Sequence, residues 1–352
     1  MTAKTRRSPA DDVGREQHVF QHRQGRSSWR HTEDPSLKAS IKHRMEYALF
    51  RTLLAGLNAL PEALAYGGVA AIGRLYYTCN KRRQKYARQF LRQAFPDSKT
   101  DRELYNLGRQ AFGNFMKVAM DLVVAQHRLR HKPMEAYVDG IQEMRECLNN
   151  GPMMVVSGHL GSWEAGAMVV AHTVSEAHVI TRPLKNPLVR KFIESHRESL
   201  GLHVHPRRGG IRAISRALDT GSVGLQAVDQ NQRLRGVFAP FFGKLASTER
   251  AAATLAVRKG YPIAVCFCLR VGTGFKFRTE VCDVIQPEPT TDGEDSAIAV
   301  SRLVRRINTS LEKAILRYPE QYLWTHDRYR TQPDNPQPTP DYDGVAAAVS
   351  TY

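Results

Sequence analysis

The pattern of apolar and polar positions divides the chain into four parts. Residues 1–40 are polar and almost free of apolar periodicity, which predicts a disordered basic arm. Residues 41–80 are rich in Leu, Ala, Gly and Tyr, and they predict helices that associate with a membrane. Residues 81–330 carry the periodicities of regular structure and form the main predicted domain. Residues 331–352 are a Pro-rich tail, which we also expect to be disordered.

Within the main domain, the hydrophobic period changes near residue 151. The run "DRELYNLGRQAFGNFMKVAMDLVVAQ" begins with Asp and repeats apolar residues every three or four positions, which predicts an amphipathic helix. Further along, short apolar runs such as "PMMVVSG" and "PIAVCFCLRV" alternate with helical segments such as "PLVRKFIESHRESLG". Apolar strands that alternate with helices predict an α/β fold, with a central, mostly parallel mixed sheet flanked by helices.

The apolar segment at residues 45–77 is interrupted by Arg51, Pro61 and Glu62. A helix that spans a membrane needs about 20 predominantly apolar residues, so we expect two helices, broken at Pro61, that lie on a membrane. The basic run "NKRRQKYARQFLRQ" follows directly and would face anionic lipid headgroups. Ordinary core helices are the alternative interpretation of this segment.

The charge balance of the chain is strongly basic. Its 352 residues include 51 Lys and Arg against 34 Asp and Glu, a formal net charge of +17. Such a surplus indicates an anionic partner, which could be nucleic acid, an anionic membrane surface or an acidic protein. The basic residues are spread along the chain without a helix-turn-helix, zinc-finger or base-stacking motif, so we expect no nucleic-acid partner.

The five cysteines are few, odd in number and scattered, which argues against a secreted disulfide framework and favours reduced thiols in a cytoplasmic compartment. Cys266 and Cys268 would point to the same side of one apolar strand. Because no histidine or second cysteine pair lies near them in the sequence, we interpret them as core residues and not as metal ligands.

The stretch "VVSGHLGSWEAG" carries the strongest candidate chemistry. His159 follows an apolar strand, Gly158 and Gly161 permit a tight turn, and Ser162 can cap a helix whose first turn holds Glu164. In one interpretation this is a structural turn that happens to carry a histidine and a glutamate. In the other, the carboxylate fixes the tautomer of the imidazole and leaves its second nitrogen as a general base.

The surroundings of this stretch limit the chemistry it can do. No G-x-S-x-G nucleophile elbow accompanies it, so a base here would activate a substrate hydroxyl. The spacing H-x-x-x-x-E is not the zinc motif H-E-x-x-H, and no third ligand is in register. We therefore expect no metal site.

The surrounding residues resemble the bacterial lipid A biosynthesis (lauroyl/myristoyl-type) acyltransferases, within the glycerolipid/lysophospholipid acyltransferase superfamily. "SGHLGSWE" resembles the His-x-x-x-x-Glu block of that family. Four more blocks follow in the order of the family: "ITRPLKNPLVRKFIESHRESLG", "RRGGIRAISRALDTGSVGLQAVDQ", "GVFAPFFGKLAST" and "YPEQYLWTHDRYR". The resemblance covers about residues 45–330, so the main domain at 81–330 is expected to be an acyltransferase domain.

The resemblance implies that a fatty acyl chain moves from an acyl carrier protein thioester to a hydroxyl of a lipid A precursor or related glycolipid. The thioester is a co-substrate, and no cofactor is implied. Catalysis would fall to His159 as general base and Glu164 as the residue that orients it. The substrate-binding positions would be Arg182, Arg197, Asp229 and Gln230. The implied partners are acyl carrier protein and anionic membrane lipid, at the cytoplasmic face of the inner membrane.

Two alternatives remain open on the sequence. One is a lysophospholipid or glycolipid acyltransferase that uses acyl-CoA, and the other is a membrane-bound relative without catalytic activity. The last block also departs from the family, because Asp327 stands where a basic residue is usual. This departure weakens the expectation of an anion contact at that position, and it leaves His159 and Glu164 unaffected.

Overall fold

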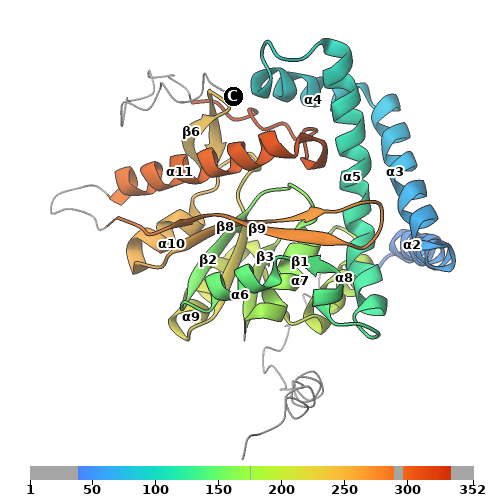
Figure 1. Ribbon diagram of the computed structural model, residues 1–352, viewed down its shortest axis with the longest axis horizontal. Coiled ribbons are helices and arrows are strands. Elements are labelled where there is room, and N and C mark those ends of the chain that lie inside the picture. The colour runs from blue at the N-terminus through green and yellow to red at the C-terminus, as the bar shows by residue number, and fades with distance from the viewer. Residues whose placement is uncertain (1–38, 175, 289–295, 334–352) are drawn as a thin grey trace, which may run out of the picture.

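The computed structural model describes residues 39–174, 176–288 and 296–333 (Figure 1). The predicted tail lies almost wholly outside these residues, as does the predicted N-terminal arm. The described chain is the predicted α/β fold, with helices on both faces of a central sheet.

The centre of the molecule is a seven-stranded sheet with the order β1-β9-β8-β2-β5-β3-β4. All neighbouring strands are parallel except β8 and β9, which confirms a mostly parallel mixed sheet. A separate two-stranded hairpin is formed by β6 and β7. The strands are β1 Val138–Asp139, β2 Met153–Ser157, β3 Ala177–Thr181, β4 Leu202–Pro206, β5 Val223–Ala227, β6 Val237–Phe241, β7 Lys244–Thr248, β8 Ile263–Arg270 and β9 Phe277–Ile285.

Two layers of helices cover the faces of the sheet. One layer contains α9 (Arg207–Asp219), α10 (Ala251–Lys259) and α11 (Ser296–Arg317), and the other contains α6 (Ile141–Leu148), α7 (Trp163–Thr173) and α8 (Pro187–Ser199). Figure 1 shows α11 along one face and α6 and α7 on the other. Short 3₁₀ turns, η1 (Met134–Ala136) and η2 (Pro319–Gln321), precede β1 and follow α11.

The alternating side chains of the central strands divide the core in two. In β2, Met154 and Val156 belong to the core under α9–α11, whereas Met153 and Val155 belong to the core under α6 and α7. Strand β8 is buried over seven consecutive residues, as expected for a strand covered on both faces. Cys266 and Cys268 lie on the α7 side of this strand and are buried free thiols, which confirms their interpretation as core residues.

From residue 39 onward, four α-helices precede the sheet: α2 (Ile41–Ala59), α3 (Glu62–Cys79), α4 (Lys81–Ala94) and α5 (Asp101–Arg128). The predicted break at Pro61 is confirmed, because that residue separates α2 from α3. Helix α3 packs along α5, where a Cβ on Gly73 would lie 3.1 Å from the Cα of Gly113. Among the described residues, none of the helices combines the length and the apolar character that crossing a membrane requires.

Helix α2 turns an apolar face to the outside. Residues four positions apart on it, namely Ile41, Met45, Leu49 and Leu53, are 59–79% exposed, and Leu54 is its one buried residue. Helix α3 also exposes apolar side chains, namely those of Leu64, Ile72 and Leu75, which are at least 60% exposed. We call these seven residues the apolar surface. Several exposed apolar side chains on two helices that contact each other are typical of a site that meets another protein or a membrane.

Candidate active site

The candidate site lies at the carboxyl edge of the parallel strands. Strands β2 and β5 are neighbours, and their last residues, Ser157 and Ala227, are register partners. His159 follows β2 by two residues, and Asp229 follows β5 by two residues. The shared register therefore brings both side chains to the same place, at the edge where α/β sheets bind their ligands.

Asp229 holds His159 through two hydrogen bonds. Its Oδ2 accepts a hydrogen bond from the backbone N–H of His159 at 2.7 Å, and its Oδ1 lies 2.7 Å from Nδ1 of the imidazole. Because a carboxylate only accepts hydrogen bonds, Nδ1 carries the proton and Nε2 keeps its lone pair. The amide nitrogen of Gln230 lies 3.1 Å from Nε2 and donates to it. A substrate hydroxyl that replaced this amide would meet the basic nitrogen.

His159 and Asp229 shift each other's pKa in opposite directions. Burial alone would raise the pKa of Asp229, but the charge of a protonated His159 and the hydrogen bonds from it lower that pKa to about 2. Burial would lower the pKa of His159, but the Asp229 carboxylate outweighs it and holds that pKa above its ordinary value. Asp229 is therefore ionised at neutral pH, and His159 is a stronger base than a free imidazole.

The turn between β2 and α7 has the predicted form. Gly161 has a φ of +67°, and a Cβ at this position would collide with the carbonyl oxygen of Cys268. Ser162 is the N-cap of α7, and its hydroxyl accepts a backbone hydrogen bond from the first turn at 3.2 Å. The backbone N–H of Leu323 donates to the carbonyl oxygen of His159 at 3.1 Å. The turn is thus fixed by the strand beside it and by the segment after η2.

Glu164 does not orient His159, and this corrects the predicted pairing. Its carboxylate forms a bidentate ion pair with Arg197 of α8, with distances of 3.0 Å from Nε to Oε2 and 2.5 Å from Nη2 to Oε1. The reason is that Glu164 lies in the first turn of α7, where both of its oxygens face α8. Its charge still contributes to the raised pKa of His159. Asp229 occupies the place beside the imidazole that the sequence assigned to Glu164.

The two predicted arginines have different surroundings. Arg197 is largely buried, and its charge is balanced by Glu164. Arg182 directly follows β3, is exposed and lines the cleft beside His159. Within the described part of the chain it has neither a hydrogen bond nor an ion pair. Arg182 is therefore available to an anionic group, whereas Arg197 fixes α8 against α7.

His326 belongs to this site but is not among the residues that the sequence assigned to it. Its Nε2 accepts a hydrogen bond from the backbone N–H of Asn231 at 2.9 Å, which anchors the loop that carries Asp229 and Gln230. Burial, together with the charges of His159 and nearby arginines, lowers its pKa to about 4, so the ring is neutral at neutral pH. The sequence signal that could have assigned His326 to the site was its place in the block "YPEQYLWTHDRYR".

A cleft of about 1310 Å³ opens beside His159. Three acidic residues line it, among them Asp327, against seven arginines, which are Arg82, Arg83, Arg182, Arg197, Arg207, Arg233 and Arg330. Its inner part is apolar and lies between α7 and the sheet, where its lining includes Val155, Val170, Val179, Leu202 and Leu225. The cleft thus combines a cationic entrance with an apolar interior, which suits a ligand with an anionic head and a hydrocarbon chain.

Known proteins match the chain over most of its length. The model of the family described as "Bacterial lipid A biosynthesis acyltransferase" matches residues 35–331. The chain is 28% identical over 279 residues to the lipid A biosynthesis palmitoleoyltransferase of Escherichia coli (strain K12), a match that covers 74% of this chain and 83% of that protein. It is 25% identical over 289 residues to the lipid A biosynthesis lauroyltransferase of the same organism, covering 78% of this chain and 88% of that one.

A third relative is the lipid A biosynthesis acyltransferase 2 of Shigella flexneri, which is 22% identical over 287 residues, or 80% of this chain and 89% of that protein. The identities are low, but the family model matches residues 35–331, which contain both His159 and Asp229. The family match confirms the resemblance found in the sequence. The chain is an acyltransferase that belongs to the bacterial lipid A biosynthesis acyltransferase family.

Proposed function

We propose that this enzyme transfers a fatty acyl chain from an acyl carrier protein thioester to a hydroxyl of a lipid A precursor, with His159 as general base. The observation that carries the proposal is the hydrogen-bonded pair of His159 and Asp229, which opens into the arginine-lined cleft. The names of the relatives support lipid A as the class of acceptor.

The proposed reaction needs no covalent intermediate on the enzyme. Nε2 of His159 removes the proton of the acceptor hydroxyl as its oxygen attacks the carbonyl carbon of the thioester. Asp229 stabilises the imidazolium that forms. The tetrahedral intermediate then breaks its carbon–sulfur bond, and the leaving thiolate takes the proton from His159. The products are an ester on the acceptor and the free thiol of the carrier, and the enzyme returns to its starting state.

The lining of the cleft matches both substrates of this reaction. Lipid A precursors carry phosphates, for which the planar guanidinium of an exposed arginine such as Arg182 is a good donor. The phosphate that joins the thiol arm to an acyl carrier protein has the same chemistry. The apolar space between α7 and the sheet is where the hydrocarbon chain would lie, with its thioester end at His159.

The donor and the acceptor are tested together in one assay. The purified enzyme is incubated with a lipid A precursor and either acyl carrier protein thioester or acyl-CoA, and the lipid is analysed by mass spectrometry. We expect the mass of one acyl group to be added with the carrier protein donor. Acylation of the precursor with acyl-CoA but not with the carrier protein thioester would contradict the proposed donor. The absence of acylated lipid A precursor with both donors would contradict the proposed acceptor.

We further propose that the apolar surface of α2 and α3 lies in the cytoplasmic leaflet of the inner membrane. Helix α4 follows α3 and contacts it, and it is rich in the basic residues that contact with anionic headgroups requires. Tyr76 of α3 and Arg82 and Arg83 of α4 also line the cleft. The elements that would touch the bilayer therefore border the active site, and a lipid acceptor could enter without crossing water.

Substitution of Leu49 and Leu53 by Glu should release the protein from membranes. Both side chains are about 60% exposed, at 62% and 59%, so removing them from lipid costs about 3 kcal/mol, or more than a hundredfold in partitioning. The measurement is sedimentation with vesicles that contain anionic lipid. The matched control replaces Ala55 and Asn58, which are exposed residues of the same helix, and adds the same charge. Equal release of both double variants would argue against the apolar surface as the contact.

A further inference from the structure

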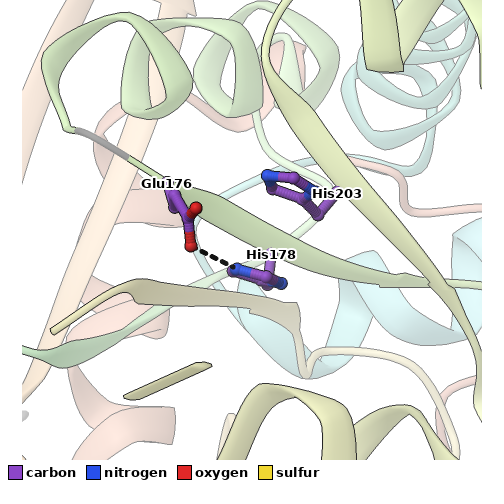
Figure 2. Close-up of side chains that lie close together, drawn as sticks. All are labelled: Glu176, His178 and His203. Atoms are coloured by element: carbon purple, nitrogen blue, oxygen red, sulfur yellow. Dashed lines mark ion pairs between the residues drawn. The ribbon is translucent and has the colours of Figure 1, made fainter. Parts of the chain in front are cut away.

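A second cluster of polar side chains lies at the opposite edge of the sheet. Glu176 directly precedes β3, His178 is the second residue of β3, and His203 is the second residue of β4. The ligand atoms of these three residues all lie within 4.8 Å of one another. Figure 2 shows Glu176 directed at His178, with His203 beside them. We call these residues the Glu-His-His cluster.

The register of β3 and β4 creates the cluster. His178 and His203 are partners across the parallel pair, and their rings are stacked with centroids 4.6 Å apart. The Oε2 of Glu176 lies 3.6 Å from Nε2 of His178. This distance is longer than a hydrogen bond, but it is close to the separation of two ligand atoms around a tetrahedral ion with bonds of about 2.0–2.1 Å.

His178 is the member whose surroundings point most directly to a ligand. The residue is 8% exposed, and its Nε2 is buried without a hydrogen-bond partner. Its other nitrogen, Nδ1, lies 2.9 Å from Nε2 of His205. If the Nδ1–H group of His178 donates a hydrogen bond to His205, then Nε2 of His178 carries a lone pair. This lone pair points into the cluster, where no hydrogen-bond donor meets it. Buried polar atoms without a partner are rare, and a bound ion would give this nitrogen its partner.

We propose that the Glu-His-His cluster binds a divalent transition-metal ion, for which Zn²⁺ is the best match. Two imidazole nitrogens and one carboxylate oxygen are a common ligand set for Zn²⁺, with a water molecule as the fourth ligand. The hydrogen bond between His178 and His205 would fix the tautomer of a ligating imidazole. Ser222 donates to Oε2 of Glu176 at 3.1 Å and would orient the carboxylate in the same way.

The position of the cluster indicates a structural metal and not a catalytic one. It lies at the amino edge of β3 and β4, whereas His159 lies at the carboxyl edge, and a strand of five residues separates these edges by about 16 Å. Among the described strands, β4 is the last in the order of the sheet and pairs with β3 alone. An ion held by both strands would tie this edge strand to the sheet. The proposal is thus independent of the proposed reaction.

The test uses full-length, tag-free protein that has been treated with a chelator and dialysed. Titration with Zn²⁺ in a calorimeter should give one tight site per chain, and bound Zn²⁺ should raise the melting temperature. Co²⁺ in the same site should give the intense visible absorption of tetrahedral coordination. Glu176→Gln keeps an acceptor for Ser222 but removes the anionic ligand, and we expect it to weaken Zn²⁺ binding at least a hundredfold.

Two further variants keep the result interpretable. His178→Gln should abolish the site, and His196→Gln, at a histidine of α8 that is bonded to the Phe192 carbonyl oxygen, should bind Zn²⁺ as the wild type does. Folding of each variant is checked by circular dichroism. If His178→Gln does not fold, Glu176→Gln alone decides, because Glu176 is exposed. The absence of a tight site in the wild type, or a site that persists in Glu176→Gln, would overturn the proposal.

Discussion

Replacing Asp229 by Asn should lower kcat for acyl transfer by about 10²–10⁴-fold, comparable to the loss expected for His159→Ala. Asp229 accepts two hydrogen bonds from His159, one from the backbone N–H and one from Nδ1. An asparagine has one acceptor oxygen and one amide nitrogen, so it can satisfy only one of these donors. The imidazole would lose both its fixed tautomer and the charge that stabilises its protonated form.

The pH dependence separates this role from a structural one. The Asp229 carboxylate raises the pKa of His159, and a general base acts in its neutral form. The kcat/KM of the wild type should therefore rise with pH until it passes the raised pKa of His159. In Asp229→Asn this inflection should move to lower pH, because the carboxylate no longer favours the imidazolium, while the maximal rate is reduced. A reduced rate with an unchanged inflection would contradict the assignment of Asp229.

Glu164→Gln is the informative comparison. Glu164 forms an ion pair with Arg197, and its only effect on His159 is the electrostatic effect of its charge. This variant should therefore keep the tautomer of His159 and lose less activity than Asp229→Asn. A glutamine can still accept one hydrogen bond from Arg197, which preserves the contact between α7 and α8. If Glu164→Gln lost more activity than Asp229→Asn, the roles drawn from the geometry would be reversed. Circular dichroism of each variant would exclude unfolding as the cause.

The sequence predicted the elements of the site better than it predicted their contacts. The strand before His159, the glycine turn and the N-cap at Ser162 depend on local preferences, and all three are confirmed. The partner of His159 depends on strand order, which no local pattern contains. Glu164 is five residues from His159 along the chain, but its side chain faces α8. Asp229 is seventy residues from His159, but the pairing of β2 with β5 places the two residues side by side.

The same limit explains why the sequence indicated no metal site. His178 and His203 are separated by an entire helix, α8, and their spacing matches no short motif. They meet because β3 and β4 are parallel neighbours with these two residues in register. Only the pairing of those strands turns three separate residues into a candidate site.

Removal of Asp121 should have the largest effect on stability, because it breaks a buried network beside the active site. Asp121 of α5 is 0% exposed. It accepts hydrogen bonds from the Tyr66 hydroxyl at 2.8 Å and from the Ser162 hydroxyl at 2.6 Å, and it forms an ion pair with the largely buried Arg270. One carboxylate thus joins α3, α5, β8 and the N-cap of the helix that follows His159.

Asp121→Ala should therefore lower the free energy of unfolding by about 3–5 kcal/mol, because it leaves the charge of Arg270 buried without a partner. Urea denaturation followed by circular dichroism measures this change. The matched control is Asp101→Ala in the same helix, since Asp101 also pairs with arginines, Arg88 and Arg92, but its side chain is 50% exposed. An exposed pair contributes about 1 kcal/mol or less. Similar losses for the two variants would show that burial of the network does not determine its contribution to stability. The expected difference would show that the buried carboxylate, which joins α3, α5, β8 and the N-cap of α7, stabilises the fold more than an exposed ion pair of the same helix does.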